Sequence, residues 1–111
     1  MVRRGDIYFT TLEDGVGSEQ AGRRPVVVVQ NNIGNMYSPT VIVIPVTSAT
    51  KRPMATHVKL GMDYGLFRES IALAEQIMTL DKRRLGECLG RIDDIKMTEI
   101  DKALMASLGI E

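Results

Sequence analysis

Two adjacent arginines, Arg23 and Arg24, stand between a polar loop and a strongly apolar segment. The residues before them are rich in glycine and polar side chains, and those after them are Pro25 and four consecutive valines, Val26–Val29. Such a run predicts a strand buried on both faces, whose backbone would fix an arginine at its start while the guanidinium stays in solvent. A guanidinium held in this way can bind a phosphate through two parallel hydrogen bonds. A hairpin whose loop merely ends in two arginines has the same pattern, so the pattern alone leaves both interpretations open.

Two hydroxyl side chains, Thr47 and Ser48, end a second apolar segment, Thr40–Ser48 (TVIVIPVTS). Pro45 within it has no amide hydrogen, so we expect this strand to bulge there or to lie at the edge of a sheet. A bulge redirects the residues that follow it, which would aim Thr47 and Ser48 into a site and away from the core. The alternative is a strand-end hydroxyl bonded to nearby backbone, which is a common local arrangement.

Further polar residues are candidates for contacting a ligand, and they lie in three segments. The Glu13–Gly22 loop is longer than a hairpin turn, and long loops in compact domains are often functional. The Ala49–Ala55 loop carries cations suited to attract phosphate, and the alanine face of Ser70–Leu80 would let a ligand approach Gln76. The candidates are Glu19, Gln20, Lys51, Arg52, Ser70, Gln76 and Thr79. Each of these residues also has an interpretation without a binding role. The loop residues can simply be solvated, Ser70 and Thr79 can be ordinary polar residues at strand ends, and Gln76 can be a buried amide bonded across strands.

Composition points to one cytoplasmic globular domain, residues 1–111, and excludes several classes of protein. No apolar run approaches the roughly 18 to 20 residues that cross a bilayer, so no membrane association is expected. The N-terminal residues lack the apolar core of a secretory signal. The lone Cys88 cannot form an internal disulfide, which fits a reducing cytoplasm. With one cysteine and one histidine, His57, a zinc site is improbable, and we expect no metal or other cofactor.

The net charge of zero conceals an asymmetry along the chain. Residues 1–91 hold twelve Lys/Arg and nine Asp/Glu, whereas residues 92–111 hold two and five. A mildly basic body with an acidic tail permits contact with a nucleic acid on one face without requiring it.

The elements that must position these side chains are mostly strands. Short alternating or uniformly apolar runs predict strands at Asp6–Leu12, Arg24–Gln30, Thr40–Ser48, Thr56–Leu60, Ser70–Leu80 and Leu85–Ile92. Helix formers within Ser70–Leu80 make a helix its rival interpretation. We expect turns at Asn31–Asn35 and Gly61–Gly65, and one helical turn at Asp81–Arg84.

The one long helix is predicted at Asp94–Leu108, capped by Asp93 and ended by Gly109. Its buried stripe would be Met97, Ile100, Leu104 and Leu108. The fold class is therefore mainly β (α+β): a small, strongly bent antiparallel barrel or sheet with a C-terminal helix.

Six segments, taken in order, resemble one known family along nearly the whole chain. They are RGDIYF, GSEQAGRRPVVVVQNN, YSPTVIVIPVTS, THV, EQIMTLDKRRL and the closing helix that ends in LMASLGI. This combination is similar to the MazF/PemK toxins of type II bacterial toxin–antitoxin modules. The resemblance implies an SH3-like barrel of the CcdB/PemK type, a homodimer, and a sequence-specific, metal-independent endoribonuclease that cuts single-stranded mRNA. It also implies inhibition by a MazE-like antitoxin, whose acidic tail would occupy the RNA groove.

In this family catalysis is assigned to an arginine at the start of the RPV strand and a threonine at the end of the third strand. These positions fall on Arg24 and Thr47, with Arg23 as an additional cation that precedes Arg24. Metal-free cleavage uses the 2′-hydroxyl as nucleophile and leaves a 2′,3′-cyclic phosphate and a 5′-hydroxyl. A single histidine excludes a pair of imidazoles as acid and base, so Arg24 would stabilise the phosphorane and Thr47 would bind the scissile phosphate or orient the 2′-hydroxyl. The general base stays unassigned, since arginine is a poor base. Relatives with these motifs suggest a short site with an ACA core flanked by U.

Two other functions share this expected fold. A CcdB-like toxin would inhibit gyrase without nuclease activity, but that branch depends on a C-terminal tripeptide containing tryptophan, and this chain has no tryptophan. A catalytically silent SH3-like module would only bind nucleic acid or peptide, and the fold alone does not distinguish it from an enzyme.

Overall fold

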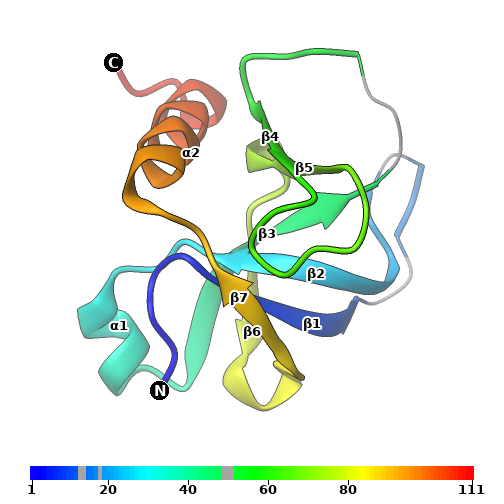
Figure 1. Ribbon diagram of the computed structural model, residues 1–111. Coiled ribbons are helices and arrows are strands. Elements are labelled where there is room, and N and C mark those ends of the chain that lie inside the picture. Colours follow the sequence, from blue (N-terminus) through cyan, green and yellow to red (C-terminus); the bar gives the residue numbers. More distant parts are fainter. Residues whose placement is uncertain (13–14, 18, 49–51) are drawn as a thin grey trace.

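The computed structural model describes residues 1–12, 15–17, 19–48 and 52–111, which form a bent antiparallel sheet with one long helix against it (Figure 1). The strands are β1 (Asp6–Leu12), β2 (Gly22–Val28), β3 (Thr40–Thr47), β4 (His57–Gly61), β5 (Ser70–Leu73), β6 (Met78–Asp81) and β7 (Cys88–Arg91). The helices are α1 (Asn32–Tyr37) and α2 (Asp94–Leu108), with single 3₁₀ turns η1 (Ala74–Gln76) and η2 (Lys82–Arg84). The strand order is β4-β5-β3-β2-β1-β7, and β6 pairs with β3. The predicted fold class, mainly β with a C-terminal helix, is confirmed.

The valine run lies in the middle of this sheet and is buried on both faces, as its composition predicts. Val27 and Val29 belong to the core beneath α2, together with Ile44 and Ile100. Val26 and Val28 belong to a second core on the other face. Alternate valines of this run therefore pack into the two cores and fix the register of the sheet.

Pro45 causes neither the bulge nor the edge position that we expected. It lies inside the sheet, where it pairs with Val26 of β2. On the other side of β3, β6 pairs with residues 40–43 and β5 with residues 46–47, so the ladder skips Ile44 and Pro45. The proline is tolerated because the partner strand is interrupted opposite it, which spares a ladder hydrogen bond that Pro45 could not donate.

The same interruption corrects the prediction of a single strand over Ser70–Leu80. This segment forms β5, the 3₁₀ turn η1 and then β6. Ala74, Glu75 and Gln76 are all good helix formers, so the helical interpretation holds for the middle of the segment and the strand interpretation for its two ends. The expected helical turn before β7 is present as η2, where the Asp81 side chain accepts a hydrogen bond from the amide of Arg83.

The expected turn after β2 is a short helix, α1, because the Asn31 side chain accepts a hydrogen bond from the amide of Gly34 and caps it. Helix α2 has the predicted bounds: Asp93 caps its start, and Gly109 ends it with a φ of 70°. Met97 and Ile100 are buried and Leu104 is half-buried, but the prediction for Leu108 is wrong, since it is 60% exposed. Ala103 is buried instead, whereas Leu108 occupies the last helical position before Gly109. Figure 1 shows α2 lying beside β4.

The loop that follows β4, residues 62–69, packs against β7, the strand at the other end of the strand order. Gly65 and Gly90 of β7 face each other's backbone so closely that a Cβ on Gly65 would lie 1.9 Å from the carbonyl oxygen of Leu89. Tyr64 has a left-handed φ of 62°, and its hydroxyl donates a 2.8 Å hydrogen bond to Asp93. Burial and the Asp93 carboxylate raise the pKa of Tyr64 to about 12. These contacts hold the loop against β7 and the start of α2.

We expect the charge of Asp93 to contribute to stability in a pH-dependent way. The amide of Lys96 and then the hydroxyl of Tyr64 hold the pKa of Asp93 below its usual value. A carboxyl with a lowered pKa in the folded state stabilises the fold above its unfolded pKa of about 3.9, and this contribution is lost as the pH falls through the folded-state pKa. Urea unfolding followed by circular dichroism at pH 7 and pH 2.5 or so checks this.

Asp93→Asn is the matched variant, because asparagine caps helices well but carries no charge. At pH 7 it should have a lower unfolding midpoint than the unchanged protein, and the difference should shrink at low pH. A difference that does not change with pH would contradict the role given to the carboxylate. Asp93→Ala, which also loses the cap, should be less stable than Asp93→Asn at both pH values.

Candidate functional site

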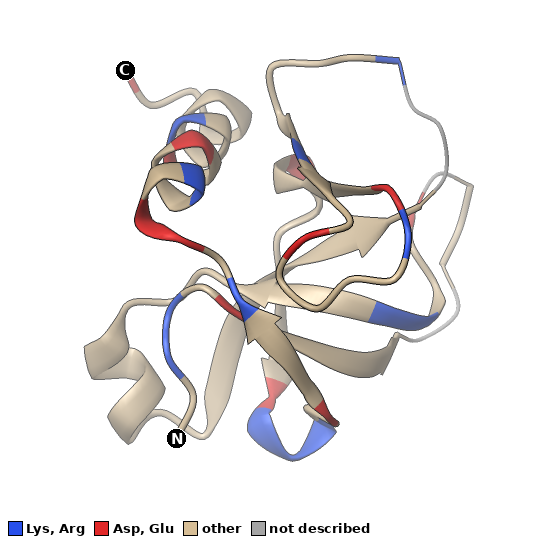
Figure 2. Cartoon of the chain, viewed as in Figure 1, with Lys and Arg blue, Asp and Glu red and all other residues tan. Residues whose placement is uncertain are grey.

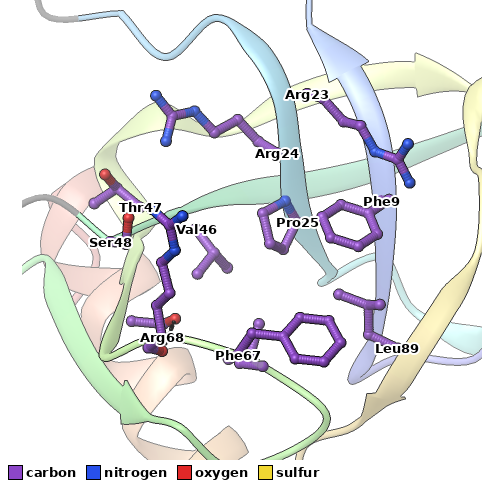
Figure 3. Close-up of a pocket in the computed structure, with 12 residues that line it drawn as sticks. Phe9, Arg23, Arg24, Pro25, Val46, Thr47, Ser48, Phe67, Arg68 and Leu89 are labelled. Atoms are coloured by element: carbon purple, nitrogen blue, oxygen red, sulfur yellow. Dashed lines mark hydrogen bonds between the residues drawn. The ribbon is translucent and has the colours of Figure 1, made fainter.

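A pocket of about 420 Å³ lies where the starts of β2 and β5 and the end of β3 meet β1, β7 and the 62–69 loop (Figure 3). Its lining is Phe9, Arg23, Arg24, Pro25, Val46, Thr47, Ser48, Leu66, Phe67, Arg68, Ser70 and Leu89. We call it the arginine pocket. Three of these side chains are arginines, and none of the described lining residues is acidic. The pocket therefore favours an anion.

One half of the arginine pocket is polar. Figure 3 shows that Arg24 and Arg68 both extend toward Thr47 and Ser48. The Nε of Arg24 donates a 3.1 Å hydrogen bond to the carbonyl of Ala21, which fixes the plane of the guanidinium. Thr47 is only 1% exposed at the end of β3, where it pairs with Ile71 of β5. Two guanidinium groups beside two hydroxyl groups are suited to hold the oxygens of a phosphodiester.

The other half is apolar and contains Phe9, Pro25, Phe67 and Leu89 (Figure 3). Arg23 lies over the ring of Phe9, with its guanidinium carbon 4.4 Å from the ring centre. Figure 3 shows Arg23 and Arg24 pointing in different directions, one over Phe9 and one toward Thr47. Of the two adjacent arginines, Arg24 is thus the one directed to the predicted threonine.

A second pocket, of about 520 Å³, lies between the loop before β2 and the segment from η1 to β6. Its lining is Leu12, Gly15, Glu19, Gln20, Glu75, Gln76, Ile77, Met78, Thr79, Leu80 and Arg84. We call it the glutamine pocket. The backbone amide of Gln20 donates a 3.0 Å hydrogen bond to the side-chain oxygen of Gln76, which connects the loop before β2 to η1. Two carboxylates and one guanidinium make this lining mixed in charge, unlike that of the arginine pocket.

The structure distributes the predicted residues over both pockets. Arg23, Arg24, Thr47, Ser48 and Ser70 line the arginine pocket, whereas Glu19, Gln20, Gln76 and Thr79 line the glutamine pocket. Arg52 is exposed and lines neither, and Lys51 lies outside the described residues. The Ser70 hydroxyl donates a 2.6 Å hydrogen bond to the carbonyl of Arg68, so it positions that residue's backbone.

Sequence reasoning missed Phe9, Phe67, Arg68 and Leu89 as pocket residues. The signal for two of them was present: Phe67 and Arg68 are an adjacent aromatic residue and cation, separated by Leu66 from the predicted turn Gly61–Gly65. The signal for Phe9 and Leu89 was absent, because each occupies an ordinary strand position whose place near the site depends on the pairing of β1 with β2 and β7.

Other features of the surface bear on the chemistry. In Figure 2, Lys and Arg lie at the start of β2, in η2 and near the N-terminus, and the start of α2 is acidic. His57 lines neither pocket; its Nε2 lies 3.0 Å from a carboxylate oxygen of Glu75. Among the described residues no cluster of His, Cys, Asp and Glu could hold a metal ion. The helices in these same stretches of chain are too short or too polar to cross a membrane.

Comparison with known proteins gives consistent matches over the whole chain. Residues 3–108 match the family model described as PemK-like, MazF-like toxin of type II toxin-antitoxin system. The chain is 47% identical to Endoribonuclease EndoA of Bacillus subtilis, over 99% of this chain and 97% of that protein. Among solved structures it is similar to a mycobacterial endoribonuclease in complex with its cognate antitoxin, with 30% identity, a TM-score of 0.83, and coverage of 100% and 98% of the two chains. It is also similar to the MazE–MazF complex (Form-II) of Deinococcus radiodurans, with 27% identity, a TM-score of 0.78, and coverage of 99% and 97%.

Proposed function

Because this chain belongs to the PemK-like, MazF-like toxins of type II toxin–antitoxin systems, we propose that it inhibits growth by cutting mRNA. It is an endoribonuclease, in line with its 47% sequence identity to Endoribonuclease EndoA. The proposed activity is sequence-specific cleavage of single-stranded RNA in the cytoplasm, without a metal or cofactor, by one domain that spans residues 1–111. The observation that carries this proposal is the meeting of Arg24, Arg68 and Thr47 in one pocket that has no acidic lining among the described residues.

The proposed reaction is an internal transesterification at phosphorus. The 2′-oxygen of the ribose attacks the adjacent phosphorus, its proton passes to a base, and the bond from phosphorus to the 5′-oxygen breaks as that oxygen takes up a proton. The products are a 2′,3′-cyclic phosphate and a 5′-hydroxyl. Negative charge grows on the non-bridging oxygens in the transition state, and donors fixed before the reaction stabilise it most. Arg24 fits this role, since its Nε is already bound to the Ala21 carbonyl.

Thr47 is proposed to bind the scissile phosphate or to orient the 2′-hydroxyl beside it. Its near-complete burial at the end of β3 restricts the movement of its side chain. Ser48, Ser70 and Arg23 are proposed to contribute to RNA binding in the same pocket, and Arg52 and Lys51 to attract the RNA backbone from nearby loops. Arginine is nearly always protonated in proteins, so Arg24 is not assigned as the base.

The glutamine pocket is proposed to read bases. The side-chain amides of Gln20 and Gln76 can each donate and accept hydrogen bonds. The edges of unpaired bases also carry both donors and acceptors, so the two can pair. The side-chain oxygen of Gln20 is buried and has no hydrogen-bond partner among the described residues, so its capacity to accept a hydrogen bond is unused unless the side chain turns toward a ligand. Glu19 and Thr79 lie beside these amides. A short recognition sequence containing U and ACA is the expected substrate.

Two protein partners are proposed. The solved complexes of similar toxins contain an antitoxin, in one case MazE, and an acidic tail of such a protein would compete with RNA for the arginine pocket. The second partner is another copy of the chain, in a homodimer. The side chains of Met54 and Met62 are more than half exposed, and they are candidates for the dimer contact.

One assay tests the proposed function. A long mRNA is incubated with the purified protein in excess chelator, and both ends of every fragment are mapped. We expect cuts at a recurring short sequence, with 5′-hydroxyl and 2′,3′-cyclic phosphate ends. The absence of cleavage in the chelator, with cleavage restored by a divalent ion, would contradict the metal-free mechanism, and random cuts would contradict base reading.

A further inference from the structure

We propose that the apolar half of the arginine pocket is a nucleobase subsite, in which a base next to the scissile phosphate stacks on Phe67. This inference rests on the proposed ribonuclease function and adds a contact that neither the sequence motifs nor the catalytic assignment requires. Phe67 is the residue on which it depends, because this side chain lines the pocket and yet is 77% exposed. A large aromatic ring left so exposed contributes little to the core and is available to a ligand.

The backbone of Phe67 is held on both sides, although its ring is exposed. Before it, Gly65 is packed against β7 and Leu66 is buried in the core. After it, the carbonyl of Arg68 accepts a hydrogen bond from Ser70. The ring is therefore carried by a fixed segment of the loop, and stacking on it would cost little additional ordering of the chain.

Phe67 has partners suited to a flat, apolar ligand. Figure 3 places its ring on the same side of the pocket as Phe9 and Leu89. Phe9 already stacks with the Arg23 guanidinium, at 4.4 Å from ring centre to guanidinium carbon. Unpaired bases in RNA stack on aromatic rings and on arginine planes in this manner. Phe67, Phe9 and Arg23 together offer such surfaces around one cavity.

The place of the subsite follows from the order of residues in the loop. Phe67 and Arg68 are neighbours in sequence, yet the first lies in the apolar half and the second extends to Thr47 and Ser48 (Figure 3). A nucleotide has the same arrangement, with a flat base and a charged phosphate joined by a short sugar. One nucleotide can thus place its phosphate between Arg24 and Arg68 and its base on Phe67.

The chemistry of the apolar half also predicts how selective this subsite is. The side chains of Phe9, Pro25, Phe67 and Leu89 have no hydrogen-bonding groups, so they cannot read the edge of a base. Every base has a π-face, and stacking alone tolerates sequence. The subsite should therefore increase affinity at one position without selecting a base there, which leaves selection to other contacts.

The test uses an RNA that carries the mapped cleavage sequence and is blocked by 2′-deoxyribose at the nucleotide whose 2′-hydroxyl would attack. Its Kd is measured for the unchanged protein and for Phe67→Ala, on the intact RNA and on two versions with an abasic nucleotide on either side of the scissile phosphate. We expect Phe67→Ala to weaken binding of the intact RNA about 5- to 150-fold, the usual range for loss of one stacked base. On one of the two abasic RNAs the variant and the unchanged protein should bind equally.

Two control variants make the result specific. Phe67→Trp retains a stacking surface and should bind at least as well as the unchanged protein. Tyr37→Ala removes an aromatic side chain that is 78% exposed on α1, lines neither pocket and should leave the Kd unchanged. Thermal unfolding of each variant verifies that it is folded, which we expect since both positions are exposed.

The outcomes separate this inference from the proposed function. If the unchanged protein cuts no RNA, the proposed function is wrong. If it cuts RNA but Phe67→Ala binds as well as the unchanged protein, or loses the same factor on both abasic RNAs, the subsite is wrong and the function stands. If Phe67→Ala instead weakens only the binding of an antitoxin peptide, the exposed ring serves a protein partner and the nucleobase subsite is likewise overturned.

Discussion

Arg24→Ala is expected to lower kcat/KM for RNA cleavage by about 10²- to 10³-fold, the usual cost of removing a donor that stabilises charge in a transition state. Most of the loss should be in kcat, because charge on the non-bridging oxygens grows only as the reaction proceeds. Arg24→Lys should recover part of the rate, since lysine retains the charge but cannot form two parallel hydrogen bonds. Initial rates on a short RNA with the mapped site give kcat and KM separately.

Arg23→Ala is the matched control, because it removes a guanidinium from the neighbouring residue of the same strand. Arg23 stacks on Phe9 and points away from Arg24, so its loss should raise KM and change kcat little. Arg68→Ala should fall between the two, with effects on both constants. If Arg23→Ala costs more in kcat than Arg24→Ala, the assignment of Arg24 is wrong.

Gly65→Ala is expected to give the largest loss of stability, about 3 kcal/mol, because it combines overpacking with a strained backbone. A methyl group there would lie 1.9 Å from the Leu89 carbonyl oxygen, and the backbone has a φ of 85°. The loop would have to move away from β7, and Phe67 and Arg68 would move with it. Urea unfolding should show the loss, and RNA cleavage should fall by more than the unfolded fraction explains.

Gly109→Ala separates the two causes. Gly109 has a similar φ of 70°, but a Cβ there meets nothing within 4 Å. This variant should show only the cost of a left-handed alanine, about 1 kcal/mol, and normal cleavage. Equal losses at the two positions would mean that the contact between the loop and β7 contributes nothing.

The features that sequence alone predicts are those encoded locally. Four adjacent valines have no polar face, so burial on both sides of a sheet follows from composition. The limits of α2 follow from Asp93 and Gly109. The Asp93 side chain caps the first turn, and the left-handed φ of Gly109 ends the last turn. Neither inference needs knowledge of a distant residue.

The wrong predictions concern residues whose conformation or burial depends on residues distant in the sequence. The break at η1 lies opposite Pro45 in the neighbouring strand β3, and neither the break nor the proline indicates the other by local pattern. Leu108 continues the apolar period of α2, but its side chain is exposed at the last position of the helix. Only the family resemblance predicts that Arg24 and Thr47 share a site. The sequence shows Phe67 and Arg68 as an aromatic–cation pair, but their place in the pocket depends on the packing of their loop on β7.

The pairing of the first strand with the last has a consequence for synthesis of the protein. β1 is bonded to β7, with Asp6 opposite Arg91, and the lining of the arginine pocket runs from Phe9 to Leu89. A chain still on the ribosome therefore lacks one wall of its pocket until β7 has emerged, and such distant pairing also slows folding. The complete arginine pocket therefore forms only when synthesis of the chain is nearly finished.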